Sequence, residues 1–249
     1  MIDKKQIELD LESLNNDDFY YGEGGQKYLS ASTIKTRVET PHLYGQPQEE
    51  VLPFLTGKYF HTMILEPEKL INFHIVDIGS RNTNVYRNYI AEEGIEFALL
   101  RKEVDDLTTL KDALMQKNVL KELIHSKGNE YEKPAIATIF GMEWKGKADI
   151  VTDNKVIDIK TSGNADKFKW SANDYNYDSQ AYIYEQLFGK PVEFYIIDKT
   201  TLKLKIAKPS PETILRGREK VLKAIEVYKT FFAEDSAEDI TQYIEREEF

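Results

Sequence analysis

Hydrophobic and polar residues follow different patterns in the two halves of the chain. Before residue 125 the pattern mainly predicts helices, over 49–65, 84–93 and 103–124. The first of these is expected to be interrupted near Pro53 and to end at Glu66-Pro67. Ser30 or Ser32 is expected to cap a further short helix that ends before Pro41. Residues 15–25 predict a loop, and residues 71–76 predict a short strand.

The pattern changes after residue 130. Residues 130–161 are rich in Ile, Val, Thr and aromatic residues, with turn signals at Gly141, Gly146 and Asp153-Asn154, which predicts a three-stranded meander. A helix over 174–188, strands over 192–198 and 202–207, a long helix over 211–233 and a last helix near Ile240 are expected to follow. Together these elements predict an α+β or mixed α/β fold, in which helices flank a central, mostly antiparallel sheet.

The length of 249 residues is sufficient for one large domain, and a hydrophobic fraction of 41% is sufficient for a core. We therefore expect one domain over 1–249. Its parts would be a mainly helical region over 1–125, a sheet core over 126–208 and C-terminal helices over 209–249.

Composition narrows the cellular setting. The chain has no cysteine, no apolar run of the roughly 18 residues that a membrane span needs, and a polar start at 1–5 unlike a signal peptide. These features favour a cytoplasmic protein. The formal net charge of −10 is unfavourable for a protein that binds a polyanion. Either the basic groups are concentrated in one cleft, with acidic residues gathered at 233–239 and 245–248, or the partner is not a polyanion.

Residues 147–160 predict a β-hairpin whose turn lies on Asp153-Asn154. Cβ atoms of directly opposed residues are about 4.5–5.5 Å apart. A slip of one residue would send Asp149 to the other face of the sheet. With this turn, three pairs face each other across the hairpin: Val151 and Val156, Ile150 and Ile157, Asp149 and Asp158.

Strand alternation then sorts these residues onto two faces. Asp149, Asp158 and Lys160 lie together on one face, and a bound divalent cation would offset the repulsion between the two carboxylates. A lysine beside such a cation can act on the attacking water or on a phosphate. Alternatively, the three residues form a solvated face with one weak ion pair. The opposite, apolar face would hold Ala148, Ile150, Ile157 and Ile159.

The same residues resemble the PD-(D/E)XK nuclease superfamily, in which one strand carries an Asp and the next carries Asp/Glu-x-Lys. Residues 146–149 (Gly-Lys-Ala-Asp) and 157–162 (Ile-Asp-Ile-Lys-Thr-Ser) resemble the branch with the nuclease domain of bacterial recombination enzymes and phage exonucleases. Residues 29–32 resemble the opening helix of the exonuclease VIII-like group, and residues 81–83 begin a stretch similar to its helical insertion. The resemblance spans about 29–184 and implies a restriction-endonuclease-like core.

Three further positions match this branch. His61, within 57–67, corresponds to a metal ligand, although by itself it is also typical of a partly buried helix histidine. Gln180 and Tyr184 form a Gln-x-x-x-Tyr element, which implies support of the active site and contact with the DNA backbone. The tyrosine is equally consistent with a core-facing side chain. Glu132, or its rival Glu130, corresponds to an acidic residue that binds metal or orients the water.

The resemblance implies metal-assisted phosphodiester hydrolysis with Mg²⁺ or Mn²⁺, as one or two ions. Lys160 would position or deprotonate the water, or screen the scissile phosphate. Lys167, Lys169 and Trp170 would contact DNA, together with Tyr184, unless this run is an ordinary surface loop. The implied metal ligands are His61, Asp149, Asp158 and the main-chain carbonyl of Ile159.

The resemblance favours a 5′–3′ exonuclease on double-stranded DNA in phage-type recombination. It would work beside a single-strand annealing protein, in the cytoplasm of a bacterium or phage-infected host. Closed rings occur among related exonucleases, so the resemblance is compatible with an oligomer, although no residue of this sequence points to one. The alternatives are a structure-specific or restriction-like endonuclease and a non-catalytic nuclease-fold DNA-binding module. A small-molecule metallohydrolase is a third, and it would explain the net charge.

Overall fold

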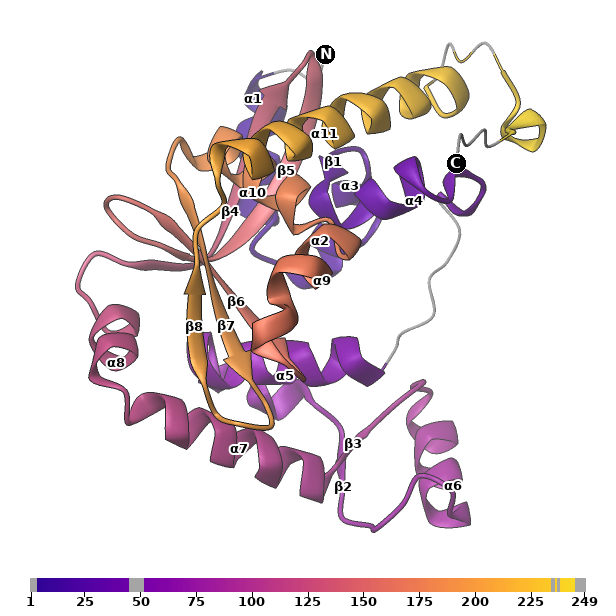
Figure 1. Cartoon of the computed structure of the whole chain (residues 1–249). Coiled ribbons are helices and arrows are strands. Elements are labelled where there is room, and N and C mark those ends of the chain that lie inside the picture. Colours follow the sequence, from indigo (N-terminus) through magenta and orange to yellow (C-terminus); the bar gives the residue numbers. More distant parts are fainter. Residues whose placement is uncertain (1–3, 45–51, 234–235, 237, 245–249) are drawn as a thin grey trace.

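A six-stranded mixed sheet lies at the centre of the computed structural model, which describes residues 4–44, 52–233, 236 and 238–244 (Figure 1). The strand order is β1-β5-β6-β7-β8, and β4 also pairs with β5. Two neighbouring pairs are parallel, β1 with β5 and β6 with β7, and the others are antiparallel. The predicted fold class is therefore confirmed. The strands are β1 (Leu29–Ser30), β4 (Glu130–Ile139), β5 (Met142–Val151), β6 (Val156–Ser162), β7 (Val192–Asp198) and β8 (Leu204–Ala207).

Helices cover both faces of this sheet, and a small unit of β2 (Ile75–Val76), β3 (Leu99–Leu100) and α6 (Asn84–Glu93) lies beside it (Figure 1). The other α-helices are α1 (Lys4–Ser13), α2 (Asp17–Tyr21), α3 (Glu23–Gln26), α4 (Ile34–Val38), α5 (Leu52–Leu65), α7 (Arg101–Met115), α8 (Asn118–Ile124), α9 (Phe168–Asp174), α10 (Tyr177–Phe188) and α11 (Pro211–Phe231). Short 3₁₀ turns span Ala31–Thr33, Pro41–Leu43, Pro67–Asn72, Ala165–Lys167 and Ile240–Gln242.

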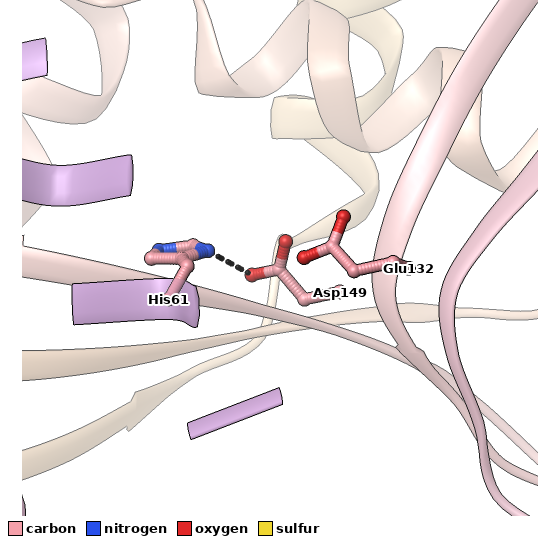
Figure 2. A group of neighbouring side chains, drawn as sticks. All are labelled: His61, Glu132 and Asp149. Atoms are coloured by element: carbon pink, nitrogen blue, oxygen red, sulfur yellow. Dashed lines mark ion pairs between the residues drawn. The ribbon is translucent and has the colours of Figure 1, made fainter. Parts of the chain in front are cut away.

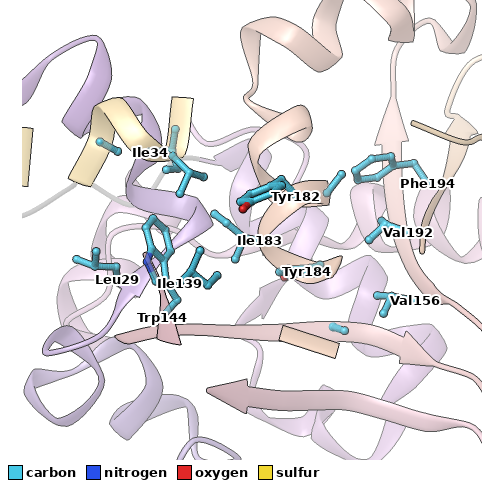
Figure 3. Close-up of a cluster of buried hydrophobic side chains, with 14 of the residues drawn as sticks. Leu29, Ile34, Ile139, Trp144, Val156, Tyr182, Ile183, Tyr184, Val192 and Phe194 are labelled. Atoms are coloured by element: carbon cyan, nitrogen blue, oxygen red, sulfur yellow. The ribbon is translucent and has the colours of Figure 1, made fainter. Parts of the chain in front are cut away.

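Strand alternation divides the core into two clusters, one on each face of the sheet. Val151 and Val156 point into the first cluster, with Trp144 and with residues of α4, α9, α10 and α11 (Figure 3). Ile150 and Ile157 point into the second cluster, with residues of α5, α7 and α8. Burial of each such side chain contributes about 1.5–3 kcal/mol. The sheet is thus held rigidly between two helical layers.

Helix α10 is fixed to α11 by close packing and by ion pairs. Gly217 of α11 lies so near α10 that an added Cβ would stand 2.1 Å from the main-chain oxygen of Asp178. The buried Asp178 carboxylate lies 2.6 Å from Arg216 Nε and 3.1 Å from Lys220 Nζ. A buried carboxylate needs such partners. The position of α10 over the sheet therefore depends on α11.

The predicted loop over 15–25 is wrong, because this segment contains α2 and α3. The Asn16 side chain accepts hydrogen bonds from the main-chain N–H groups of Asp18 and Phe19, which makes it a helix cap rather than a turn residue. The predicted turn at Gly146 is also wrong, since Gly146 lies within β5. A Cβ there would stand 2.5 Å from Leu187 of α10, so this glycine allows a helix to approach the strand.

Several predicted boundaries differ from the observed ones. Pro53 lies in the first turn of α5 and does not interrupt it, while residues 49–51 lie outside the described residues. The strand expected over 71–76 is reduced to β2, after a 3₁₀ turn. The helix over 103–124 is divided into α7 and α8, and the one over 174–188 follows α9 after Asn176, which has a φ of 56°. The strand β1, from the mainly helical region, joins the central sheet.

No helix among the described residues is sufficiently long and apolar to cross a bilayer. The acidic stretches over 233–239 and 245–248 lie largely outside the described residues.

Candidate active site

A cleft of about 730 Å³ opens at the place where β5 and β6 diverge. Helices α2 and α5, strands β4 to β6 and helix α10 contribute to its lining. Eight residues singled out from the sequence line it: His61, Glu132, Asp149, Asp158, Ile159, Lys160, Gln180 and Tyr184. Residues far apart in the sequence are therefore neighbours in one cavity.

The hairpin between β5 and β6 has the predicted turn but separates early. Val151 pairs with Val156 and Ile150 pairs with Ile157, as expected, but the described ladder ends there. Asp149 and Asp158 are not ladder partners. Instead, Asp149 Oδ2 accepts a hydrogen bond of 2.6 Å from the main-chain N–H of Ile159. Two directly opposed carboxylates would repel each other. Where the strands separate, the hydrogen bond from Ile159 to the Asp149 carboxylate therefore takes the place of the next backbone hydrogen bond.

The separation also corrects one assignment to a face of the sheet. Ile150, Ile157 and Ile159 share the second core cluster, as predicted. Ala148 packs with the first cluster instead, beyond the last residue pair that joins β5 to β6.

His61, Glu132 and Asp149 converge from α5, β4 and β5 (Figure 2). One ligand atom from each lies within 4.8 Å of the other two. His61 Nδ1 is 3.4 Å from Asp149 Oδ2. Two carboxylates and an imidazole at this spacing suit a divalent cation that accepts oxygen and nitrogen ligands.

Glu132 reaches the cluster through an unusual backbone conformation. Its φ is 44°, in the left-handed region that non-glycine residues rarely adopt, and it lies within β4. Such strain is typical of functional sites. Its rival Glu130 has a half-exposed side chain that pairs with Lys133 at 2.5 Å. The structure thus brings Glu132 beside Asp149 and leaves Glu130 outside this group.

Asp158 is buried and is held by two side chains. Its Oδ2 accepts a hydrogen bond of 2.6 Å from Gln180 Nε2 of α10. Its Oδ1 lies 2.6 Å from Lys160 Nζ but has no well-aligned hydrogen bond within the described part of the chain. Lys160 Nζ also lies 4.8 Å from the centre of the Tyr177 ring, a cation–π contact. The Lys160 ammonium group is thus held between the Asp158 carboxylate and the Tyr177 ring.

Burial and mutual charge shift the pKa values of the whole group. Burial, followed by the Asp149 carboxylate, raises the pKa of Glu132 to about 8. Burial also raises the pKa of Asp158 to about 6, against the opposing effect of Lys160. For His61 burial favours a lower pKa, but Asp149 outweighs it and raises the pKa to about 9. For Asp149 burial favours a higher pKa, but His61 outweighs it and lowers the pKa. A bound cation would stabilise the ionised forms of Glu132 and Asp158, whose pKa values are raised.

Of the predicted DNA-contacting residues, only Tyr184 is among the described residues that line the cleft. Tyr184 is buried, and its hydroxyl donates a 2.7 Å hydrogen bond to the main-chain carbonyl of Lys147. Lys167, Lys169 and Trp170 are exposed at the start of α9 and are not among the described residues that line the cleft. The carbonyl of Ile159 belongs to the residue whose N–H binds Asp149. The roles assigned to these residues stay predictions.

Sequence reasoning assigned no role to several residues of the cleft, among them Asp17, Lys58, Lys147 and Tyr177. Lys147 Nζ is 2.8 Å from Asp17 Oδ1, and Lys58 Nζ is 3.4 Å from Asp17 Oδ2. The sequence separation from predicted site residues could have identified the two lysines. Lys58 precedes His61 by one helical turn, and Lys147 precedes Asp149 by two strand positions, so each lysine shares a face with a site residue. No local signal points to Asp17.

The fold and the cleft together define a nuclease-like protein of the PD-(D/E)XK type. Residues 32–242 match the model of the family described as "PDDEXK-like domain of unknown function (DUF3799)", and the chain belongs to this family. No significantly similar protein was found among curated proteins.

One solved structure supports the same fold. The "Putative exonuclease" from Eubacterium rectale aligns with a TM-score of 0.61 at 16% identity, over 85% of each chain. A phage-related exonuclease from Haemophilus somnus 129PT aligns over 81% of this chain and 93% of its own, at 14% identity and a TM-score of 0.36. An alkaline exonuclease from Laribacter hongkongensis covers 90% and 92%, at 11% identity and a TM-score of 0.35. The last two scores are too low to define a shared fold.

Proposed function

We propose that this chain is a Mg²⁺-dependent deoxyribonuclease. The observation that carries the proposal is the convergence of His61, Glu132 and Asp149 with the Asp158–Lys160 pair in one cleft. A lysine beside a potential cation site, with nearby carboxylates, suits hydrolysis of a phosphodiester. The nuclease-like fold supports the same reaction class, and the residues of the site supply its chemistry.

The residues of the site fit a divalent cation. His61, Glu132 and Asp149 would hold it, and Asp158 would join them if Lys160 released its Oδ1. The buried oxygen without a well-aligned partner, Asp158 Oδ1, is the atom that such a change would satisfy. When bound, Mg²⁺ or Mn²⁺ lowers the pKa of a coordinated water and neutralises charge that develops on the phosphate. One ion or two are compatible with this donor set.

The remaining residues position these groups. Lys160 stays protonated at neutral pH because Asp158 outweighs the effect of burial and raises its pKa. We therefore assign it to electrostatic stabilisation of the phosphate and to orientation of the water, rather than to proton abstraction. Gln180 holds Asp158, and Tyr184 holds β5 through the carbonyl of Lys147. Both act as positioning residues.

Degradation of linear DNA with and without Mg²⁺ tests the proposal. Asp158→Asn and Lys160→Ala should each abolish most of the activity, because each removes a charge from the centre of the site. Asp153→Ala, at the exposed turn of the same hairpin, is the matched control and should retain it. Full activity in both site variants would refute the assignment, and a lack of Mg²⁺ binding would favour a non-catalytic DNA-binding module.

The finer proposal is a 5′–3′ exonuclease on double-stranded DNA that acts in phage-type recombination, beside an annealing protein, in a bacterial or phage-infected cell. The similarity to a structure called a putative exonuclease motivates it. An exonuclease needs a DNA end, so it should degrade linear DNA and spare closed circular DNA. Cleavage of both forms would favour the rival, a structure-specific or restriction-like endonuclease. Labels on either end of one strand would determine the polarity.

A further inference from the structure

Lys58 and Lys147 share a single carboxylate inside the cleft. Asp17 Oδ1 lies 2.8 Å from Lys147 Nζ, and Asp17 Oδ2 lies 3.4 Å from Lys58 Nζ. Each carboxylate oxygen therefore faces its own lysine. Two lysines spaced in this way can bind the two unesterified oxygens of a phosphodiester by charge-assisted contacts.

The lysine pair lies directly beside the candidate metal site. Lys58 is one helical turn from His61 on α5, so the two side chains emerge on the same face of the helix. Lys147 is two residues from Asp149 on β5, so these side chains also emerge on one face. Two of the three elements that present a candidate metal ligand, α5 and β5, thus also present a lysine on the same face.

The charge balance of the cleft gives Asp17 a particular importance. Its lining contains five lysines and five acidic residues, so it is not basic as it stands: Lys58, Lys69, Lys145, Lys147 and Lys160 against Asp17, Glu66, Glu132, Asp149 and Asp158. A cation at the metal site would offset the acidic residues there. Removal of Asp17 would then leave Lys58 and Lys147 available to a polyanion.

We propose that Lys58 and Lys147 form a phosphate-binding site for the backbone of bound DNA, and that Asp17 occupies this site until DNA displaces it. The proposal rests on the proposed function, because it takes DNA as the ligand. Helix α2 precedes residue 32, where the family match begins, so Asp17 comes from outside the matched region. The centre of the Tyr20 ring lies 4.8 Å from Lys147 Nζ, and this cation–π contact would keep the lysine in place after DNA displaces Asp17.

The experiment compares Asp17→Asn with Asp18→Asn. Asp18 lies in the same first turn of α2, is exposed and has no ion pair within the described residues, so both variants lose one charge from one helix turn. Affinity for a labelled DNA duplex is measured by fluorescence anisotropy in EDTA and in Ca²⁺. Asp17→Asn should bind about twofold to fivefold more tightly than the wild type, the factor expected when partly exposed ion pairs are released. Asp18→Asn should bind like the wild type.

Removal of either lysine should have the opposite effect. Lys58→Gln is the first variant, because this side chain is 40% exposed and its loss should not disturb folding, and Lys147→Gln is the second. Each should weaken binding and reduce the slope of log affinity against log salt by about 0.7–0.9, as for one lost phosphate contact. Thermal unfolding of every variant identifies any that fail to fold.

Equal gains in Asp17→Asn and Asp18→Asn would show a general charge effect and overturn the proposal. A lower melting temperature of Asp17→Asn without tighter binding would also overturn it, since Asp17 would then only anchor α2. Hydrolysis in Mg²⁺ is assayed separately. If no variant or wild type hydrolyses DNA but Asp17→Asn binds more tightly, the nuclease proposal fails and the phosphate site stands. If the protein hydrolyses DNA but affinity and salt slope are unchanged in all variants, the phosphate-site proposal fails and the nuclease proposal stands.

Discussion

Gln180 donates its side-chain N–H to Asp158 Oδ2 across 2.6 Å, from a helix to a buried strand. This bond occupies one oxygen of the carboxylate and turns the other toward Lys160. Because α10 is itself held by the Asp178 ion pairs to α11, the orientation of Asp158 depends on the C-terminal helix. The packing of α11 is thereby linked to the candidate active site.

Gln180→Ala should lower the rate of DNA hydrolysis by about 10–100-fold, the usual cost of losing a partner that orients a catalytic or metal-binding group. The measurement is kcat in Mg²⁺ with a linear duplex. Gln186→Ala, an exposed glutamine on the same helix, is the matched control and should keep the wild-type rate. Equal rates in the two variants would contradict the positioning role.

Glu132→Gln should weaken the binding of Mg²⁺ or Mn²⁺ by at least about tenfold, because it removes an anionic oxygen from the cluster. Titration calorimetry of the metal alone gives the affinity. Glu130→Gln removes the same charge two residues away, on a half-exposed side chain paired with Lys133, and should leave affinity unchanged. A loss in Glu130→Gln alone would reassign the third acidic residue.

The metal-free protein should lose stability as the pH rises from about 6 to 9. The pKa of Glu132 is raised from 4.5 to about 8 and that of His61 from 6.5 to about 9. A group whose pKa is higher in the folded than in the unfolded state contributes fully to stability below its unfolded-state pKa. This contribution is lost as the pH rises through its folded-state pKa. Thermal unfolding in EDTA across this range is the measurement. Glu132→Gln should flatten the dependence, and an unchanged profile would contradict the raised pKa of Glu132.

Gly217→Ala should destabilise the protein by about 1–3 kcal/mol, the usual cost of overpacking. The new methyl group would stand 2.1 Å from the Asp178 main-chain oxygen and would push α11 off α10. Gly57→Ala is the matched helix control, because nothing lies within 4 Å of the added Cβ, and it should stabilise by about 0.5–1 kcal/mol. Urea unfolding gives both values. A stabilised Gly217→Ala would show that the helices tolerate separation.

Local signals in the sequence were sufficient for the hairpin register. Asp153-Asn154 is a strong turn, and a turn determines every pair up to the point where the ladder ends. Helix α6 and strand β7 also have the predicted bounds, since caps or breakers flank a clear apolar pattern. By contrast, the Asn-Asp cluster near residue 16 suits a turn and a helix cap equally well, and only the surrounding packing selects the cap.

The sequence by itself determined that Asp149, Asp158 and Lys160 would emerge near one another, because strand period and turn position are local properties. Tertiary structure alone decided which distant residues join them. Glu132 rather than Glu130 enters the cluster through a left-handed backbone conformation that only the packed sheet stabilises. Asp17 reaches Lys58 and Lys147 because α2 packs over β5, a contact across 130 residues that no short-range pattern encodes.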